Sequence, residues 1–334
     1  MHIFRGIHHP RLATACALTI GNFDGVHRGH QAMLALLRNE ARHRALPSCV
    51  MTFEPHPRDF FAQGLGKPEM APQRIATLRD KLAELQACGI DQCVIMPFNP
   101  WLSGLAPDDF VQQVLVKGLG SRYVLVGDDF CYGAKRAGNY ASLSHSGQQL
   151  GFEVARMNSY EVADTQSQAQ AGSPSERVSS SAVRQALAQG HMQRAALLLG
   201  RSYAITGHVV HGRKLGRELN CPTLNLRFTH PRPAASGIFV ALVHGLADKP
   251  LQGVANLGVR PSLDANDVNQ GRVLLETHCL QWPDSLGREG GYGKLVRVEL
   301  LHKLHDELTY DSLESLQQGI AQDCTDARQW FEKI

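Results

Sequence analysis

The segment from residue 21 to residue 30 constrains the fold of this chain more than any other, because it places three glycines and two histidines between two patterned segments. Before it, residues 15–20 form a short apolar run, which is typical of a buried parallel strand that ends at a turn. After it, apolar residues recur at helical spacing, at Met33, Leu34, Leu36 and Leu37. The sequence therefore predicts a strand, a glycine-rich turn and a helix in direct succession.

The composition of this turn predicts a site for phosphate. Gly21, Gly25 and Gly29 let the backbone approach a ligand closely, and the helix start presents unpaired N–H groups and a positive dipole end. If the helix begins by His27, the imidazoles of His27 and His30 project on one side and can donate hydrogen bonds to phosphate oxygens. A lone histidine here would be a solvated or capping residue, but this pair favours an anion site. A zinc site would need a third ligand nearby.

The turn also resembles the signature of the bacterial bifunctional riboflavin kinase/FMN adenylyltransferase family, often called FAD synthetases. The matching residues are Gly21, Asn22, Phe23, Asp24, Gly25, Val26, His27, Arg28, Gly29 and His30. Three more segments follow in the order of the family pattern, at residues 52–57, 126–133 and 179–184. The resemblance implies a doubly wound α/β nucleotidyltransferase domain whose motifs meet at the C-terminal ends of parallel strands.

The resemblance implies adenylyl transfer without a protein nucleophile, because the FMN phosphate itself attacks the α-phosphate of ATP and expels pyrophosphate. His27, His30 and Arg184 would then stabilise charge on the reacting phosphates, and Mg²⁺ would bridge them. The other residues implied to bind nucleotide or flavin are Gly21, Asn22, Phe23, Asp24, Gly25, Gly29, His56, Asp129, Ser180 and Ser181. Two alternatives stay open, since Arg184 could be a surface ion-pair residue and Asp24 could cap the helix.

The second half of the chain has a different pattern, with short strand-like runs separated by Gly, Pro and Asn turns. The predicted strands cover residues 204–210, 238–244, 251–257, 273–280 and 296–301. This spacing favours an antiparallel β-barrel over a second doubly wound sheet. A closing helix is predicted after it, with Asp311 as its N-cap. The expected apolar stripe of that helix contains Leu313, Leu316, Ile320, Ala327 and Trp330.

This half also resembles the family, whose kinase domain is a small β-barrel closed by a C-terminal helix. The resemblance implies that Thr223 and Asn225 supply oxygen ligands for Mg²⁺. It implies nucleotide or flavin binding by Gly212, Gly216, Arg217, Gly237, Phe239, Asn256 and Arg260. Among its departures from the usual pattern are Asn220, Cys221 and Leu224, and His305 stands where an arginine is usual.

Glu276 is the predicted base of the kinase reaction on two grounds, the resemblance and its strand position. Alternation along residues 273–280 places Glu276 and His278 on one face together with Leu274 and Leu280. An acid beside leucines is partly desolvated and is suited to accept the proton of the riboflavin 5′-hydroxyl. The competing interpretation is an ion pair at the barrel rim.

Domain organisation follows from length and from the position of the motifs. A chain of 334 residues that is 43% hydrophobic can form two cores. Residues 164–175 are polar and nearly featureless, but the motif at 179–184 follows them, so they are predicted to be an insertion in the first domain. We expect an adenylyltransferase domain at 1–188 and a kinase barrel at 189–334.

Charge and cysteine usage limit the partners. A net charge of +3 without a run of like charges favours neither a nucleic acid nor a membrane as partner. The eight cysteines are scattered without a Cys-x-x-Cys pair, so we expect reduced core residues. The first residues lack the blocks of a signal peptide, which predicts a cytoplasmic protein.

The predicted function is ATP-dependent phosphorylation of riboflavin to FMN, followed by adenylation of FMN to FAD, with small molecules as the partners. One alternative is a monofunctional FMN adenylyltransferase whose barrel only binds flavin. A second is a non-catalytic flavin sensor, which the intact His27, His30, Thr223, Asn225 and Glu276 argue against.

Overall fold

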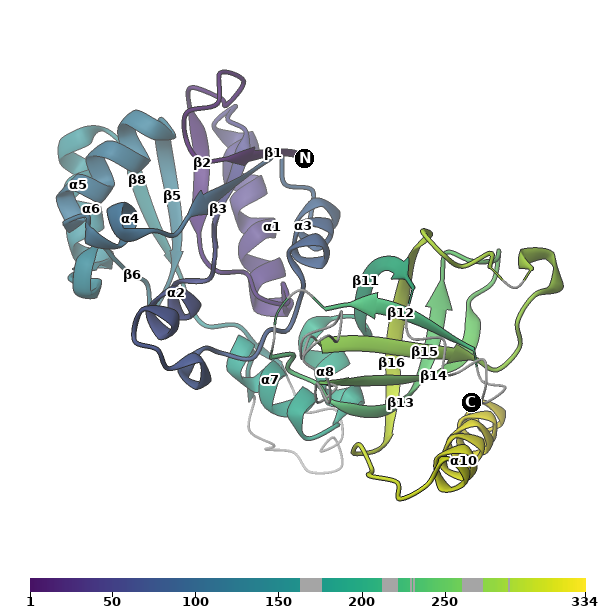
Figure 1. Ribbon diagram of the computed structural model, residues 1–334. Helices are drawn as coiled ribbons and strands as arrows, with labels where there is room; N and C mark the ends of the chain where they lie inside the picture. Colours follow the sequence, from purple (N-terminus) through teal and green to yellow (C-terminus); the bar gives the residue numbers. More distant parts are fainter. Residues whose placement is uncertain (163–175, 212–221, 229, 231, 260–272, 288) are drawn as a thin grey trace, which may run out of the picture. The chain divides into compact units, whose positions relative to one another are not determined.

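The computed structural model describes residues 1–162, 176–211, 222–228, 230, 232–259, 273–287 and 289–334. The chain divides into two compact units (Figure 1). The first comprises Met1–Pro72 and Lys81–Ser179, and the second comprises Gln73–Asp80 and Ser180–Ile334. Among the described residues, no helix combines the length and the apolar character needed to cross a membrane.

The first unit is built on a six-stranded parallel sheet with the order β1-β4-β3-β2-β5-β8. Its strands are β1 (His2–Arg5), β2 (Cys16–Ile20), β3 (Ser48–Glu54), β4 (Gln92–Pro97), β5 (Ser121–Gly127) and β8 (Glu153–Met157). Its helices include α1 (Arg28–His43), α2 (Pro57–Gly64), α3 (Leu78–Ala87), α4 (Pro100–Gly104), α5 (Pro107–Asp109), the π-helix η2 (Phe110–Gly118) and α6 (Tyr140–Leu150). The doubly wound fold expected for this half is confirmed.

Apolar side chains cover both faces of the central strand β2, which explains why all five of its residues are buried. Leu18 belongs to a hydrophobic cluster with residues of η2 and α6, such as Val114 and Leu143. Thr19 points to the opposite face, where its hydroxyl lies 3.3 Å from the Met33 sulfur of α1. A strand buried on both faces reads as a continuous apolar run, which is the pattern that predicted it.

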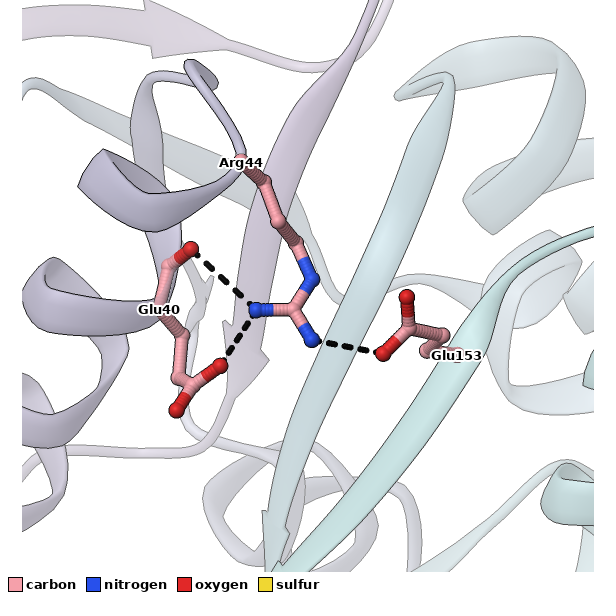
Figure 2. Close-up of polar contacts among 3 residues, drawn as sticks. All are labelled: Glu40, Arg44 and Glu153. Carbon is pink, nitrogen blue, oxygen red and sulfur yellow. Dashed lines mark hydrogen bonds and ion pairs between the residues drawn. The ribbon is translucent and has the colours of Figure 1, made fainter.

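One arginine connects the C-terminal end of α1 to the edge strand β8 of the sheet (Figure 2). Arg44 pairs with Glu40 of α1 and, at 2.5 Å, with Glu153 of the edge strand β8. Its guanidinium also lies 4.2 Å from the ring centre of Tyr123 on β5. This network anchors α1 to two strands and so helps to fix the position of its N-terminus, where the histidines lie.

The second unit contains a closed six-stranded antiparallel barrel with the order β11-β12-β15-β14-β13-β16. The strands are β11 (Tyr203–Val210), β12 (Thr223–Arg227), β13 (Gly237–His244), β14 (Leu251–Val259), β15 (Val273–Cys279) and β16 (Leu295–His305). The barrel expected for this half is confirmed. The strand β12 is additional to the five predicted strands, because its five residues follow Pro222 and carry too short an alternation to stand out.

The closing helix α10 (Leu313–Glu332) packs on the outside of the barrel, where its Cys324 and Ala327 join Val240 and Val254 in a small hydrophobic cluster. The predicted N-cap Asp311 is wrong by one residue. Ser312 is extended and its side chain accepts a hydrogen bond from the Ser315 N–H, which completes a capping box.

Three helices lie at or near the places where the chain passes from one compact unit to the other. Helix α3 begins at Leu78, because Arg74 forms a β-bridge with Pro233 and the Thr77 hydroxyl accepts a hydrogen bond from the Asp80 N–H. Helices α7 (Ser180–Ala188) and α8 (Met192–Leu199) both lie in the second unit. Apart from Gln73–Asp80, the two compact units therefore divide between Ser179 and Ser180. We expected the domain boundary near residue 188, and that boundary stays a prediction.

Candidate functional sites

The glycine-rich turn lies at the point where the strand order of the parallel sheet reverses. From β2 the chain proceeds to β3 and β4 on one side, and β5 then adds to the other side. Ligands of open α/β sheets bind outside the carboxyl ends of the strands at such a point. The turn after β2 and Asp128 and Asp129 after β5 both lie at this edge, as the sequence predicted.

Two stacked imidazoles mark the start of α1. His27 is the N-cap residue, and its Nδ1 accepts a hydrogen bond from the His30 N–H at 3.3 Å. The two ring centres are 3.6 Å apart with an interplanar angle of 17°, and the His30 ring lies 4.9 Å from that of Phe23. His27 is buried, whereas His30 is half-buried. The imidazoles therefore lie on one side of a helix N-terminus, an arrangement that can bind phosphate oxygens.

The backbone of the turn adopts costly conformations. Phe23 and Val26 have φ angles of 48° and 41°, in a region that non-glycine residues rarely adopt. Such residues cost roughly 1–3 kcal/mol each and persist only where the surroundings hold them in place. Here the Gly21 N–H donates to the Met51 carbonyl at 3.0 Å, and the Gln31 amide donates to the Val26 carbonyl at 2.9 Å. A ligand site is a common place for strain of this kind.

Glycine at position 29 keeps the start of α1 open to a ligand. A Cβ atom there would lie 3.3 Å from the His27 ring and 3.4 Å from the Val178 carbonyl oxygen. Both distances are tighter than most real contacts, so a side chain at position 29 would disturb the histidine pair.

The other predicted residues of this site take several structural roles. Asp24 is buried at 1% exposure, and His56 is the buried N-cap of α2, where its Nδ1 accepts a hydrogen bond from the Arg58 N–H at 3.1 Å. The Asp129 side chain is exposed, and its carboxylate lies 3.6 Å from the Arg177 guanidinium. Roles for these residues in binding stay predictions.

An aromatic cluster lies beside this edge of the sheet, and of its members only Phe53 belongs to a motif of the sequence analysis, the segment 52–57. Phe53 on β3, Phe60 and Phe61 on α2, and Phe98 after β4 form edge-to-face contacts with ring centres 5.4 to 5.7 Å apart. Phe61 is 51% exposed. The only sequence signal is that Phe53 and Phe98 occur at the ends of two neighbouring strands. The exposed ring offers an apolar surface for a flat ligand.

The second candidate site is a row of polar side chains on the outer face of the barrel. Asn225 of β12 and Asn256 of β14 lie directly opposite Glu276 of β15, one on each side. Residues opposite one another in antiparallel strands point to the same face and touch. The row continues to Ile238 and His305. The next row contains Leu224, Thr277, Ala255 and Phe239, which are all buried, and it continues to Lys303 on β16.

Two acceptor atoms in this row stand out. The Oδ1 atoms of Asn225 and Asn256 are buried and have no hydrogen-bond partner among the residues that the structure describes. The Asn225 Nδ2 donates to the Thr223 carbonyl at 3.3 Å, which fixes the orientation of that amide. Buried acceptors without partners are rare in folded proteins and indicate a missing ligand or water. The half-buried Glu276 lies between them.

Several other predicted residues take structural roles of their own or lie outside the described residues. Phe239 is fully buried in the barrel interior, and Gly237 has a φ of 114°, where a Cβ atom would lie 2.6 Å from the His305 carbonyl oxygen. Arg184 donates from Nε to the Gln73 carbonyl at 2.7 Å, within the second unit. Ser180 and Ser181 begin α7 in the same unit. The predicted site residues that lie outside the described residues are Gly212, Gly216, Arg217 and Arg260.

His305 lies at the end of the polar row, where its partners favour the protonated ring. Its Nε2 lies 2.7 Å from the Asp323 carboxylate of α10, and its Nδ1 lies 2.7 Å from the Asp306 carbonyl oxygen. Both partners are acceptors, so both ring nitrogens must donate. Burial lowers the pKa of His305, but these hydrogen bonds and the charges of Asp323 and Asp326 outweigh it and leave the pKa raised. The surroundings therefore favour a positive charge at the position where the family pattern has arginine.

This pair predicts a pH-dependent attachment of α10 to the barrel. A raised pKa means that the pair stabilises the fold fully below about pH 6.5, the ordinary histidine value, and loses that contribution as the pH rises through the raised value. Thermal unfolding measured from pH 6 to pH 8 should show the second unit losing part of its unfolding free energy. In Asp323→Asn this loss should be smaller than in wild type by about 0.5–1 kcal/mol. Glu314→Gln, an exposed change on the same helix, is the control and should leave the decline as in wild type. An unchanged pH profile in Asp323→Asn would contradict the assignment.

No group of three or more His, Cys, Asp or Glu side chains suited to a metal ion occurs in the part of the chain that the structure describes. The donor set on β12 is of a different kind, because Thr223 and Asn225 offer hydroxyl and amide oxygens. Such oxygens are ligands that Mg²⁺ accepts, usually alongside water and substrate phosphates.

Comparison with known proteins gives two family matches in this chain. Residues 9–170 match the family model described as FAD synthetase, and residues 199–331 match the one described as riboflavin kinase. The chain is 40% identical over 333 residues to the bifunctional riboflavin kinase/FMN adenylyltransferase of Escherichia coli (strain K12), covering 99% of this chain and 98% of the relative. It is 37% identical to the protein of the same description from Haemophilus influenzae, covering 99% of each.

Among solved structures, a crystal structure of a macrolide-efflux protein from Streptococcus pneumoniae matches with a TM-score of 0.72. The match covers 99% of this chain and 100% of that chain, at 23% sequence identity. At this identity the likeness supports the fold alone.

Proposed function

Because this chain belongs to the bifunctional riboflavin kinase/FMN adenylyltransferase family, we propose that the turn at residues 21–30 is its adenylyl-transfer site and the polar row around Glu276 its kinase site. The chain carries both an FAD synthetase and a riboflavin kinase domain, so the bifunctional reading holds rather than the monofunctional alternative. The observation that carries the proposal is the alignment of Asn225, Glu276 and Asn256 across three strands.

In the adenylyl-transfer site, the phosphates of ATP bind at the N-terminus of α1. The helix N–H groups, the backbone around Gly29 and the His30 imidazole donate hydrogen bonds to phosphate oxygens, and their contribution grows as negative charge develops in the transition state. His27 acts mainly as the N-cap that orients His30, since its Nδ1 accepts the His30 N–H. The FMN phosphate attacks the α-phosphate, and pyrophosphate leaves.

The aromatic cluster supports a place for the flavin at this same site. An isoalloxazine ring is flat and largely apolar, and Phe61 exposes half of its surface beside Phe98. Aromatic faces bind such rings by offset or edge-to-face contacts. Asp129, Asn22, Asp24 and His56 then complete the polar surroundings, and Ser180, Ser181 and Arg184 are proposed to contribute to nucleotide binding as the family pattern implies.

In the kinase site, Glu276 accepts the proton of the riboflavin 5′-hydroxyl, that oxygen attacks the γ-phosphate of ATP, and ADP leaves as the bond between the γ-phosphorus and the bridging oxygen breaks. Asn256 beside it holds the flavin or its ribityl chain through the Oδ1 acceptor. Glycines 212 and 216 with Arg217, and Arg260, are proposed to contact the nucleotide and the flavin. A cytoplasmic location, where ATP and flavins are available, fits both reactions.

Mg²⁺ fits the row on the side of β12. The buried Asn225 Oδ1 lacks a partner among the described residues, and Thr223 lies two residues away on the same face. These two oxygens would hold the ion, whose chemistry is to neutralise the phosphate oxygens of ATP.

One assay tests the whole proposal. The purified chain is incubated with riboflavin, ATP and Mg²⁺, and riboflavin, FMN and FAD are resolved by chromatography over time. FMN should accumulate first and FAD should follow from it. If FAD formed only from supplied FMN, the assignment of the kinase site to the barrel would be wrong. If no ATP were consumed, both site assignments would be wrong.

A further inference from the structure

A buried lysine lies behind the phosphate turn, and none of the motifs contains it. Lys81 is 2% exposed on α3, where it shares the buried face with Leu85 one turn later. Burying an ammonium group costs several kcal/mol unless hydrogen bonds compensate it. A lysine in such a place therefore has a role that an apolar side chain of similar length would not fulfil.

Two hydrogen bonds connect this lysine to the turn. The Lys81 ammonium donates to the Thr52 hydroxyl at 3.3 Å, and the Thr52 hydroxyl donates to the Asn22 carbonyl oxygen at 3.2 Å. Thr52 lies on β3, next to β2, and is fully buried. Since the ammonium occupies a lone pair of the hydroxyl oxygen, the hydroxyl proton is left to point at Asn22.

The atom that receives this hydrogen bond is well placed to control the site. The Asn22 carbonyl belongs to the peptide that precedes Phe23, the first of the residues with positive φ in the turn. The Phe23 ring contacts the His30 ring at 4.9 Å between centres. A rotation of the Asn22–Phe23 peptide would thus move both the strained turn and the side chain against which His30 rests.

We propose that Lys81 is a positioning residue of the adenylyl-transfer site, acting through Thr52 on the Asn22 carbonyl. The proposal rests on the assignment of adenylyl transfer to this turn. The lysine touches no substrate. It keeps the turn in its strained conformation, so that the His30 imidazole and the helix N-terminus are held for the phosphates before they bind. Misplacement of reacting groups by about 1 Å can cost about 100-fold in rate.

Stability and rate separate this role from a merely structural one. Removal of one member of a buried polar network leaves its partners unsatisfied and destabilises the fold. Lys81→Met should therefore lower the thermal midpoint of the first unit, and, assayed well below that midpoint, it should also lower kcat for FAD formation from FMN about 10- to 100-fold. A merely structural role would leave kcat of the folded protein as in wild type. The KM for ATP should change less than about threefold, because ground-state binding is retained.

The Thr52 pair tests the relay without touching the lysine. Thr52→Val keeps the branched shape and removes the hydroxyl, and it should lower kcat as Lys81→Met does. Thr52→Ser keeps the hydroxyl and should restore most of the rate. Lys117→Met, at an exposed lysine in the last turn of η2, is the matched control. If Lys81→Met does not fold, the Thr52 pair decides alone.

His30→Ala is measured in the same series to separate two failures. If His30→Ala keeps its rate of FAD formation, the assignment of the site is wrong. If His30→Ala loses the rate while Lys81→Met and Thr52→Val keep theirs, only the positioning role is overturned. FMN formation from riboflavin, catalysed by the second unit of the same preparation, should remain as in wild type throughout.

Discussion

Glu276→Gln should reduce FMN formation from riboflavin by about 100- to 10,000-fold, the range for loss of a general base, while FAD formation from supplied FMN continues. The amide keeps the shape of the carboxylate and its place between Asn225 and Asn256, but it cannot accept the proton of the riboflavin hydroxyl. The measurement is the initial rate of each product from its own substrate, with saturating ATP and Mg²⁺.

A second barrel acid controls for general effects of this change. Glu299 on β16 pairs with Arg297 at 2.6 Å and lies away from the polar row. Glu299→Gln should leave FMN formation within a few-fold of wild type, since exposed or partly exposed ion pairs contribute at most about 1 kcal/mol. If Glu276→Gln kept its kinase rate, Glu276 would be the rim ion pair of the alternative interpretation. Loss of both activities together would contradict independent sites.

His30→Ala should lower kcat/KM for FAD formation from FMN about 100- to 1000-fold, because one preorganised donor to a transition-state charge contributes roughly 3 kcal/mol. His30 is a better test than His27, because removal of the N-cap side chain at 27 would also cost about 1 kcal/mol of helix stability. The readout is FAD and pyrophosphate formation at several concentrations of ATP.

The control for this variant is His145→Ala, at an exposed histidine of α6. It should keep both activities, and His30→Ala should keep FMN formation. Turnover of His30→Ala equal to wild type would refute the role of the turn in adenylyl transfer.

The parts of the fold that the sequence predicts well are those set by local pattern. The apolar run before Gly21 and the helical spacing after His30 carry their periods within a few residues, so β2 and α1 were predictable. The barrel was predictable as a class for the same reason. Its strand β12 was not, because five residues after a proline carry too little alternation, and pairing with β15 is what makes them a strand.

The parts of the site that escape sequence reasoning depend on partners far along the chain. The positive φ angles of Phe23 and Val26 are imposed by contacts with β3 and α1, whereas sequence reasoning expects glycine at such positions. Lys81 and Thr52 are 29 positions apart, and His305 and Asp323 are 18 apart. Thr52 and His305 occur at positions that the family pattern singles out, but nothing local in the sequence points to Lys81 or Asp323 as their partners, so only the folded chain reveals the pairs.

Closure of the barrel has a consequence for the tolerance of the gene to small deletions. Thr223, Asn225 and Glu276 depend on the registration of β12 with β15, and each strand of a closed barrel is held by neighbours on both sides. Loss of a single codon within β12 would shift the rest of the strand by one residue. Each side chain after the deletion would then point to the opposite face, so the polar and apolar rows would be exchanged. Length variation among functional descendants of this chain should therefore be confined to the connections between strands.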